Sequence, residues 1–126
     1  MDQDTLLFFD GHAAALPLYE AFEQWVLSAF DPVKIKVQKT QISFYQKHLF
    51  ACVSFLPLRK AAERPSVYLT ITFGLDHRID SSRIAVATEP YPNRWTHHLM
   101  ISSPNELDEE LKGWIREAGA FSANKR

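Results

Sequence analysis

The stretch Val67-Tyr68-Leu69-Thr70-Ile71-Thr72-Phe73 decides the fold class. Its apolar residues alternate with tyrosine and threonine, which is the pattern of a β-strand with one face in a core and the other toward solvent. Short turns separate it from other strand-like runs, and short turns favour antiparallel pairing. We therefore expect an antiparallel sheet.

Two strand-like regions precede this stretch. Residues 49–56 are nearly all apolar, which predicts a central strand that is at least partly covered on both faces. Residues 33–37 alternate with their apolar positions on odd numbers, whereas Ile42 and Phe44 are on even numbers. A side-chain period of two does not survive that change, so the sequence predicts a bulge or a strand break near Lys39-Thr40.

The region after the stretch predicts further strands. Residues 94–102 read as a strand, and residues 90–93 read as a turn. Residues 81–89 fit either a short helix or an edge strand, and the strand is slightly favoured. The expected sheet therefore has four to five strands.

Helical patterns flank the strands on both sides. Apolar residues at three- and four-residue spacing predict a helix that has Pro17 near its start and stops at Asp31-Pro32. The start is open, because an earlier turn capped by Asp10 is the alternative and would place Pro17 inside a kinked helix. The run Ser103-Pro104-Asn105-Glu106 predicts a capping box that opens a second helix, with Leu107 already on its apolar stripe. The prediction is an α+β two-layer sandwich in one domain, residues 1–126, with both helices on one face of the sheet. Residues 1–10 and 122–126 are expected to be flexible.

Composition excludes several classes of protein. The chain has 126 residues, 46% of them hydrophobic, and a formal net charge of −1, which is typical of a folded domain rather than a disordered chain. A single cysteine excludes a disulfide scaffold, and its apolar neighbours predict a buried, inert Cys52 thiol. No apolar run approaches roughly 18 residues, so no membrane span is expected. Asp2 and Asp4 stand where a secretory signal would be basic, so we expect a cytoplasmic protein.

The charges are unevenly distributed along the chain. Residues 1–31 carry six acidic groups and no Lys or Arg, whereas residues 32–102 carry ten Lys or Arg against four acidic groups. A basic sheet region attracts anions, and the alternative is solvated charge that protects sheet edges. Overall neutrality makes nucleic acid a less favoured anion than a small ligand or an acidic partner.

The strand pattern also sorts the polar side chains by face. One face of the sheet carries hydrogen-bonding and aromatic groups, and it either binds something or is merely hydrated. The candidate ligand-binding residues on this face and its basic loops are Lys39, Thr40, Gln41, Ser43, Tyr45, Tyr68, Arg78, Arg94 and His98. A binding surface formed by this face and the basic loops further predicts that Lys39, Arg59, Lys60, Arg78 and Arg94 cluster together, and scattered positions would contradict it.

Catalytic and metal-binding interpretations are less favoured. Adjacent His97 and His98 point to opposite faces of a strand, so they do not chelate one metal together. His97 is expected in the core, and His98 on the open face. A small hydrolase or lyase that uses His98 with Asp76 or His77 is the enzymatic alternative. No nucleotide-binding, hydrolase-elbow or zinc-protease motif is present, and we expect neither a metal nor a cofactor.

Partners are suggested by the apolar strand 49–56. Its second face needs a cover, which the Leu6–Phe9 segment, a loop or a second subunit would supply. A homodimer is the first partner to consider, either as part of a binding module or as a purely structural assembly.

Several runs also resemble a family of small bacterial domains of unknown function. They are Phe8-Phe9-Asp10-Gly11-His12, Leu16-Pro17-Leu18-Tyr19-Glu20, Lys39-Thr40-Gln41-Ile42-Ser43-Phe44, Phe73-Gly74-Leu75-Asp76, Arg94-Trp95-Thr96-His97-His98, Glu106-Leu107-Asp108 and Trp114-Ile115. The resemblance implies an interaction or nucleic-acid-associated module without an assigned activity. The helix–sheet–helix order is remotely similar to frataxin-like iron-chaperone domains, whose dense acidic ridge this sequence lacks.

Overall fold

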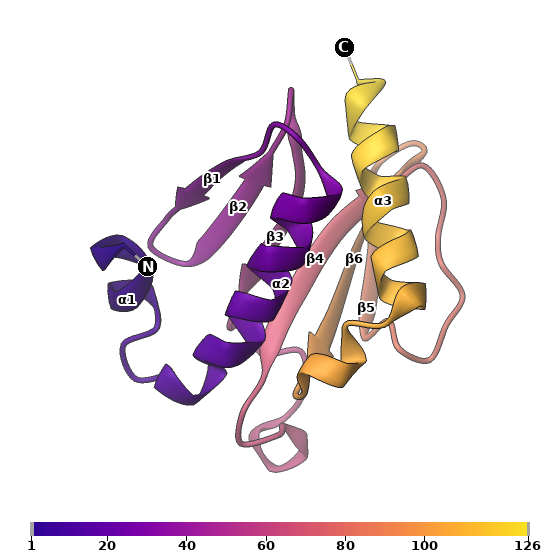
Figure 1. Cartoon of the computed structure of the whole chain (residues 1–126). Helices are drawn as coiled ribbons and strands as arrows, with labels where there is room; N and C mark the ends of the chain where they lie inside the picture. The colour runs from indigo at the N-terminus through magenta and orange to yellow at the C-terminus, as the bar shows by residue number, and fades with distance from the viewer. Residues whose placement is uncertain (1, 126) are drawn as a thin grey trace.

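The computed structural model describes residues 2–125 as helices packed on one antiparallel sheet (Figure 1). Met1 and Arg126, the outermost residues of the expected flexible ends, lie outside the described residues. The six strands lie in the order β1-β2-β3-β4-β6-β5, so β3 and β4 are central, and the central position was expected for β3. Their bounds are β1 Lys34–Val37, β2 Gln41–Tyr45, β3 Leu49–Ser54, β4 Leu69–Leu75, β5 Val86–Tyr91 and β6 Arg94–Ile101.

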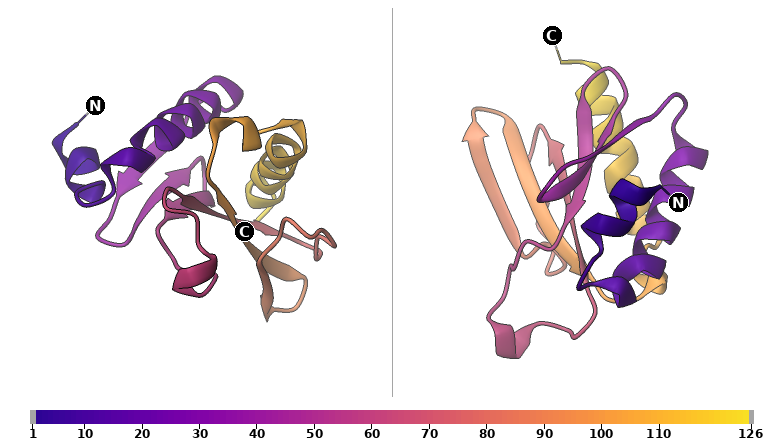
Figure 2. Two further views of the ribbon diagram at one scale, coloured as in Figure 1. Left: turned by 90° about the horizontal axis from the view of Figure 1, so that it is seen from below. Right: turned by 90° about the vertical axis from the view of Figure 1, so that its left-hand side faces the viewer.

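The two long helices, α2 (Leu16–Ala29) and α3 (Glu109–Ala123), lie on the same side of the sheet (Figures 1 and 2). Phe22 of α2 packs on Phe44 of β2 with ring centroids 5.3 Å apart. Trp114 of α3 stacks on Phe73 of β4 at 6.2 Å. The α+β class and the common face of the helices are confirmed. Within residues 2–125, no helix has both the length and the apolar character needed to cross a membrane.

The change of parity at Lys39-Thr40 marks a reversal of the chain. β1 and β2 form a hairpin in which Val37 pairs with Ile42, and the Gln38 amide donates to the Gln41 carbonyl at 2.8 Å. The expected strand break is therefore present, and it divides the region into two strands, β1 and β2. The sheet has six strands rather than four or five, and its register shifts lie between Phe44 and Tyr45 and between Thr88 and Tyr91.

The ambiguous region 81–89 is a loop followed by an edge strand. Residues 81–85 are irregular, and β5 then runs to Tyr91 beside β6. The turn is shorter than residues 90–93, because Tyr91 still pairs with Arg94. Asn93 takes the left-handed conformation there, with φ of 60°, which asparagine tolerates better than most residues.

The start of the second helix differs from the prediction. Residues Pro104–Glu106 form a separate 3-10 turn, and α3 begins only at Glu109. The Asp108 carboxylate caps α3 by accepting from the Leu111 amide at 3.0 Å. The Glu106 carboxylate accepts from the Ser102 amide instead of completing a capping box with Ser103. Two good capping residues stand close together here, and the second one starts the helix.

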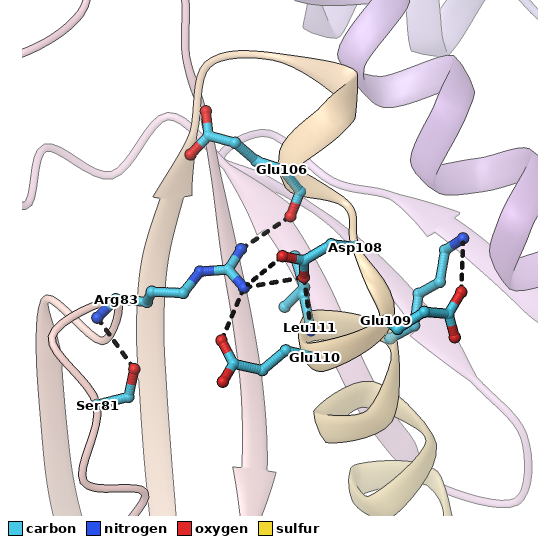
Figure 3. Close-up of polar contacts among 8 residues, drawn as sticks. Ser81, Arg83, Glu106, Asp108, Glu109, Glu110 and Leu111 are labelled. Atoms are coloured by element: carbon cyan, nitrogen blue, oxygen red, sulfur yellow. Dashed lines mark hydrogen bonds and ion pairs between the residues drawn. The ribbon is translucent and has the colours of Figure 1, made fainter.

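Arg83 fastens the irregular loop to the start of α3 (Figure 3). Its Nη1 donates to the carboxylates of Asp108 and Glu110, both at 2.9 Å, and its Nη2 donates to the Glu106 carbonyl at 2.8 Å. The guanidinium also lies 5.7 Å from the centre of the Trp114 ring. The planar guanidinium of Arg83 thus binds three acceptors, one in the 3-10 turn at residues 104–106 and two at the start of α3.

The N-terminal segment contains a short helix, α1 (Gln3–Phe8), which Asp2 caps by accepting from the Thr5 amide at 2.8 Å. Phe9 is buried against Tyr19 of α2, with ring centroids 5.2 Å apart. At the other terminus, the buried Ser122 hydroxyl donates to the Leu49 carbonyl. Both ends of the described chain are therefore tied to the sheet or to α2.

Candidate functional site

The sheet face opposite α2 and α3 carries a row of four polar side chains on adjacent strands. Ser43, Cys52, Thr72 and His98 occupy directly paired positions on β2, β3, β4 and β6. Paired residues in an antiparallel sheet point to the same face, so these side chains are lateral neighbours. The strand residues expected on the open face and those expected to face the helices lie on these faces.

A cleft of about 530 Å³ lies over this row at the end of the sheet that holds the β1–β2 turn. Its floor comes from the open face, its rim from the β1–β2 turn, and one wall from the N-terminal segment together with the chain that leaves β3. The lining residues are Phe8, Asp10, His12, Lys39, Thr40, Gln41, Cys52, Ser54, Phe55, Leu56, Thr72 and His98.

The best-defined polar contact in the cleft joins β4 and β6. Thr72 Oγ1 lies 2.8 Å from His98 Nδ1. Burial lowers the pKa of His98 below the usual value for histidine, so its imidazole is neutral at pH 7. His98 therefore offers hydrogen bonds to a ligand rather than a positive charge.

Amide side chains fix the rim next to the β1–β2 turn. The buried Ser43 hydroxyl donates to Gln38 Oε1 at 2.7 Å and accepts from Gln41 Nε2 at 2.8 Å. Lys39 and Thr40 are exposed at the tip of the turn. Ser43 is thus a support beneath the rim, whereas Lys39, Thr40 and Gln41 line the cleft.

The wall depends on Gly11 and on aromatic packing. Gly11 has φ of +82° and links Asp10 to His12. The His12 ring stacks on Phe55 with centroids 3.9 Å apart and planes inclined by 11°. The N-terminal segment and a loop were among the covers expected over strand 49–56, but Asp10 and His12 were not predicted as part of the wall, although Asp10-Gly11 is a common turn signal.

Four of the nine predicted site residues line the cleft, and five do not. Lys39, Thr40, Gln41 and His98 meet there. Of the others, Ser43 supports the rim, and Tyr68 donates its hydroxyl to the Phe55 carbonyl at 3.1 Å behind the wall. Tyr45 lies at the other end of β2, where it pairs with Lys34 of β1. Arg78 follows β4, and Arg94 begins β6.

The expected cluster of five basic residues is divided between the two ends of the sheet. Gln41 stands two residues after Lys39 and pairs with Ser54, after which the chain enters the loop of Arg59 and Lys60. Leu75 and Trp95 pair at the opposite end, beside Arg78 and Arg94. The prediction of a single basic surface is therefore wrong, because the antiparallel order separates the two loops.

His98 is not brought together with Asp76 or His77. His77 Nδ1 lies 2.7 Å from Asp76, and its Nε2 lies 3.4 Å from Glu117 of α3. His77 therefore turns toward the helix side, and His98 faces the opposite side. His97 is fully buried as expected, and its Nε2 accepts from the Ile79 amide at 3.0 Å.

Cys52 is the one cysteine of the chain, and it lies in the central strand β3. Cys52 is 8% exposed, and burial raises the pKa of its thiol. This confirms the expected buried thiol, which is a poor nucleophile. Across residues 2–125, no group of three or more His, Cys, Asp or Glu side chains is arranged to hold a metal ion.

A model for a family described as a domain of unknown function (DUF5655) matches residues 7–122 of the chain. The chain belongs to the DUF5655 family. The match includes every residue that lines the cleft of this DUF5655 domain. Neither a curated protein nor a solved structure matches it. The likeness to frataxin-like domains and the bacterial source stay predictions.

Proposed function

We propose that this DUF5655 domain is a binding module that holds a small anionic ligand in the cleft on its open sheet face. The five basic residues expected on one surface are divided between the two ends of the sheet, so the proposal does not rest on them. The observation that carries it is the meeting of Lys39, Thr40, Gln41 and His98 around one cavity of about 530 Å³. Small-molecule sites commonly have volumes of roughly 300–1,000 Å³ and a few convergent polar groups.

The lining offers chemistry that suits such a ligand. Lys39 supplies a positive charge at the rim, and Thr40 supplies a hydroxyl beside it. Gln41 and the neutral His98 supply hydrogen bonds from the floor. Partial enclosure by the wall lowers the local dielectric constant, which strengthens these contacts relative to the same groups on a flat sheet.

The experiment is a thermal-unfolding screen of the chain against phosphorylated metabolites, carboxylic acids and inorganic anions. A ligand at a hundred times its Kd stabilises the fold by about 2.7 kcal/mol, which the assay resolves readily. We expect the stabilisation to be lost in Lys39→Ala and kept in Arg94→Ala and Lys47→Ala. These two residues are equally cationic and exposed, but neither lines the cleft.

Two results would count against the proposal. One is a screen without any stabilising anion at low ionic strength. The other is a stabilising anion whose effect disappears in Arg94→Ala but survives in Lys39→Ala. The second result would move the binding site to the opposite end of the sheet.

A second candidate is a small hydrolase, which is favoured by the Thr72–His98 hydrogen bond of 2.8 Å within the cleft. His98 would accept the Thr72 proton while the hydroxyl oxygen attacks an ester carbonyl, and it would return that proton to the alcohol that leaves as the ester bond breaks. Water would then hydrolyse the acyl-threonine ester, which releases the acid and restores Thr72. The test is the hydrolysis of a p-nitrophenyl ester by the chain and by Thr72→Val, which keeps the side-chain shape and removes the hydroxyl. Equal rates exclude this role for Thr72.

The structural homodimer and the cytoplasmic location stay predictions. β3 alone does not require a second subunit, because residues 50–54 are buried within one chain. Their open face is covered by the wall, which consists of the N-terminal segment and the loop after β3. Thr70 Oγ1 holds that loop by donating to the Leu56 carbonyl at 2.8 Å. Light scattering during the ligand screen measures the oligomeric state directly.

A further inference from the structure

The wall of the cleft is aromatic, and this restricts the kind of anion that fits. Phe8, Phe55 and His12 all line the cleft. Phe8 stacks on Phe55 at 5.6 Å, with planes inclined by 23°. His12 stacks on Phe55 at 3.9 Å. A bare inorganic anion would leave these rings unused, whereas a ligand with a planar ring would contact them.

The outer ring of this wall is available to a ligand. One face of the His12 imidazole lies on Phe55, and the side chain is exposed. His12 lines this cleft and also a smaller cavity of about 110 Å³ beside residues 66–68, so the rest of the imidazole borders both spaces. Aromatic faces of this kind stack well on nucleobases, because every base has a π-face.

The platform is held rigidly from behind. Phe55 makes edge-to-face contacts with Phe9 at 5.5 Å and with Tyr68 at 6.0 Å. Tyr68 also donates its hydroxyl to the Phe55 carbonyl. Because Phe9 is buried in the core, the position of Phe55 is fixed before a ligand arrives. A preorganised platform loses little conformational entropy on binding.

The charges of the lining point to a ligand with both an anionic group and hydrogen-bond donors. Lys39 attracts an anion, but the exposed carboxylate of Asp10 also lines the cleft and repels one. Asp10 accepts hydrogen bonds when it is ionised. A ligand that brings hydroxyl or amine donors to Asp10 turns this repulsion into a favourable contact.

We propose that the anionic ligand of the cleft is a nucleoside monophosphate, with its base stacked on His12, its phosphate at Lys39 and its ribose hydroxyls or base amine at Asp10. This inference rests on the proposed function and narrows it to one chemical class. It requires that the ring and the phosphate contribute separately, through different residues of the cleft.

The experiment is isothermal titration calorimetry of the whole chain with AMP, adenosine and inorganic phosphate at low ionic strength. The variants are His12→Ala, His12→Phe and Lys39→Ala, with Lys47→Ala as the matched control. Base–aromatic stacking contributes about 1–3 kcal/mol, which corresponds to roughly 5- to 150-fold in affinity. The thermal midpoint of each variant shows whether it is folded.

We expect AMP to bind at least tenfold more tightly than adenosine or phosphate. His12→Ala should weaken AMP and adenosine at least fivefold, and His12→Phe should restore both because it keeps a planar ring. Lys39→Ala should weaken AMP and leave adenosine unchanged. Lys47→Ala should behave like the original chain.

Different failures have different meanings. If AMP depends on Lys39 but His12→Ala has no effect, the anion site stands and the nucleotide inference is overturned. If none of the anions in the wider screen binds, the proposed function itself fails. If the dinucleotide pApA binds and AMP does not, the ligand is a nucleic-acid strand, and the inference of a free mononucleotide is wrong.

Discussion

The packing of α3 against the end of α2 makes a sharp prediction for two glycines on the same helix. A Cβ atom on Gly119 would lie 2.5 Å from Cε1 of Phe30, whereas a Cβ on Gly113 would meet nothing within 4 Å. The Phe30 ring has little freedom to move away, because it packs on Phe50 at 4.6 Å and on Trp25 at 6.1 Å.

The expected magnitudes follow from two effects. Alanine stabilises a helix interior by about 1 kcal/mol relative to glycine, and both substitutions gain this amount. Overpacking a filled contact costs about 1–3 kcal/mol, and only Gly119→Ala has this cost. Gly113→Ala should therefore be about 1 kcal/mol more stable than the original chain. Gly119→Ala should be about 1–3 kcal/mol less stable than Gly113→Ala.

The measurement is urea denaturation monitored by tryptophan fluorescence, which Trp25 and Trp114 near these contacts make sensitive. The free energy of unfolding of each variant is obtained by linear extrapolation. If Gly119→Ala is as stable as Gly113→Ala, the close approach of α3 to Phe30 is not present in solution and the reasoning is refuted. Because Gly113→Ala gains the same helix propensity, it removes propensity as an explanation.

Three further predictions concern the loop, the buried histidine and the wall. Arg83→Ala should lower the free energy of unfolding by about 1 kcal/mol. Arg83→Lys should recover only part of this loss, because a lysine does not form the forked contacts of the guanidinium. Denaturation at low and high salt measures how much of the loss comes from the ion pairs. Burial lowers the pKa of His97 below its value in the unfolded chain, so stability should fall as the pH drops below about 6.5, by at most about 1.4 kcal/mol per pH unit for this one group. His97→Gln, which keeps an acceptor for the Ile79 amide, should reduce that slope in denaturation series at pH 5.5 and 7.5, and an unchanged slope would assign it to other groups. Gly11→Ala should cost about 1–2 kcal/mol by strain at positive φ and should weaken ligand binding by displacing His12, which thermal unfolding and calorimetry measure together.

The fold was largely predictable because its main signals are local. Alternation in residues 67–73 fixed the faces of β4, and the apolar run of residues 49–56 identified the centre of the sheet. A change of parity, however, has the same appearance for a bulge and for a hairpin. Only the pairing of β1 with β2 distinguishes the two, and pairing is a tertiary property.

The start of α3 shows a similar limit. Both Ser103 and Asp108 are good N-caps in the sequence, and the local pattern does not rank them. The outcome depends on a contact from far along the chain, since Arg83 binds the Asp108 and Glu110 carboxylates at the first turn of α3. A cap supported by a tertiary ion pair thus wins over a cap supported only by its neighbours in sequence.

The floor and rim of the candidate site were predictable, and so was a cover by the N-terminal segment or a loop, but not the place of Asp10 and His12 in the wall. Strand parity brings Gln41 and His98 to one face, and the β1–β2 turn places Lys39 beside them, so local rules suffice for these residues. Asp10 and His12 reach the same place only because Phe9 is buried against Tyr19 and His12 stacks on Phe55. Without that packing, the open face of the sheet would be a flat, hydrated surface on which an exposed lysine binds anions weakly. The buried Phe9 therefore connects the stability of the core to the existence of the cleft, which makes the N-terminal segment part of the site rather than an appendage to the fold.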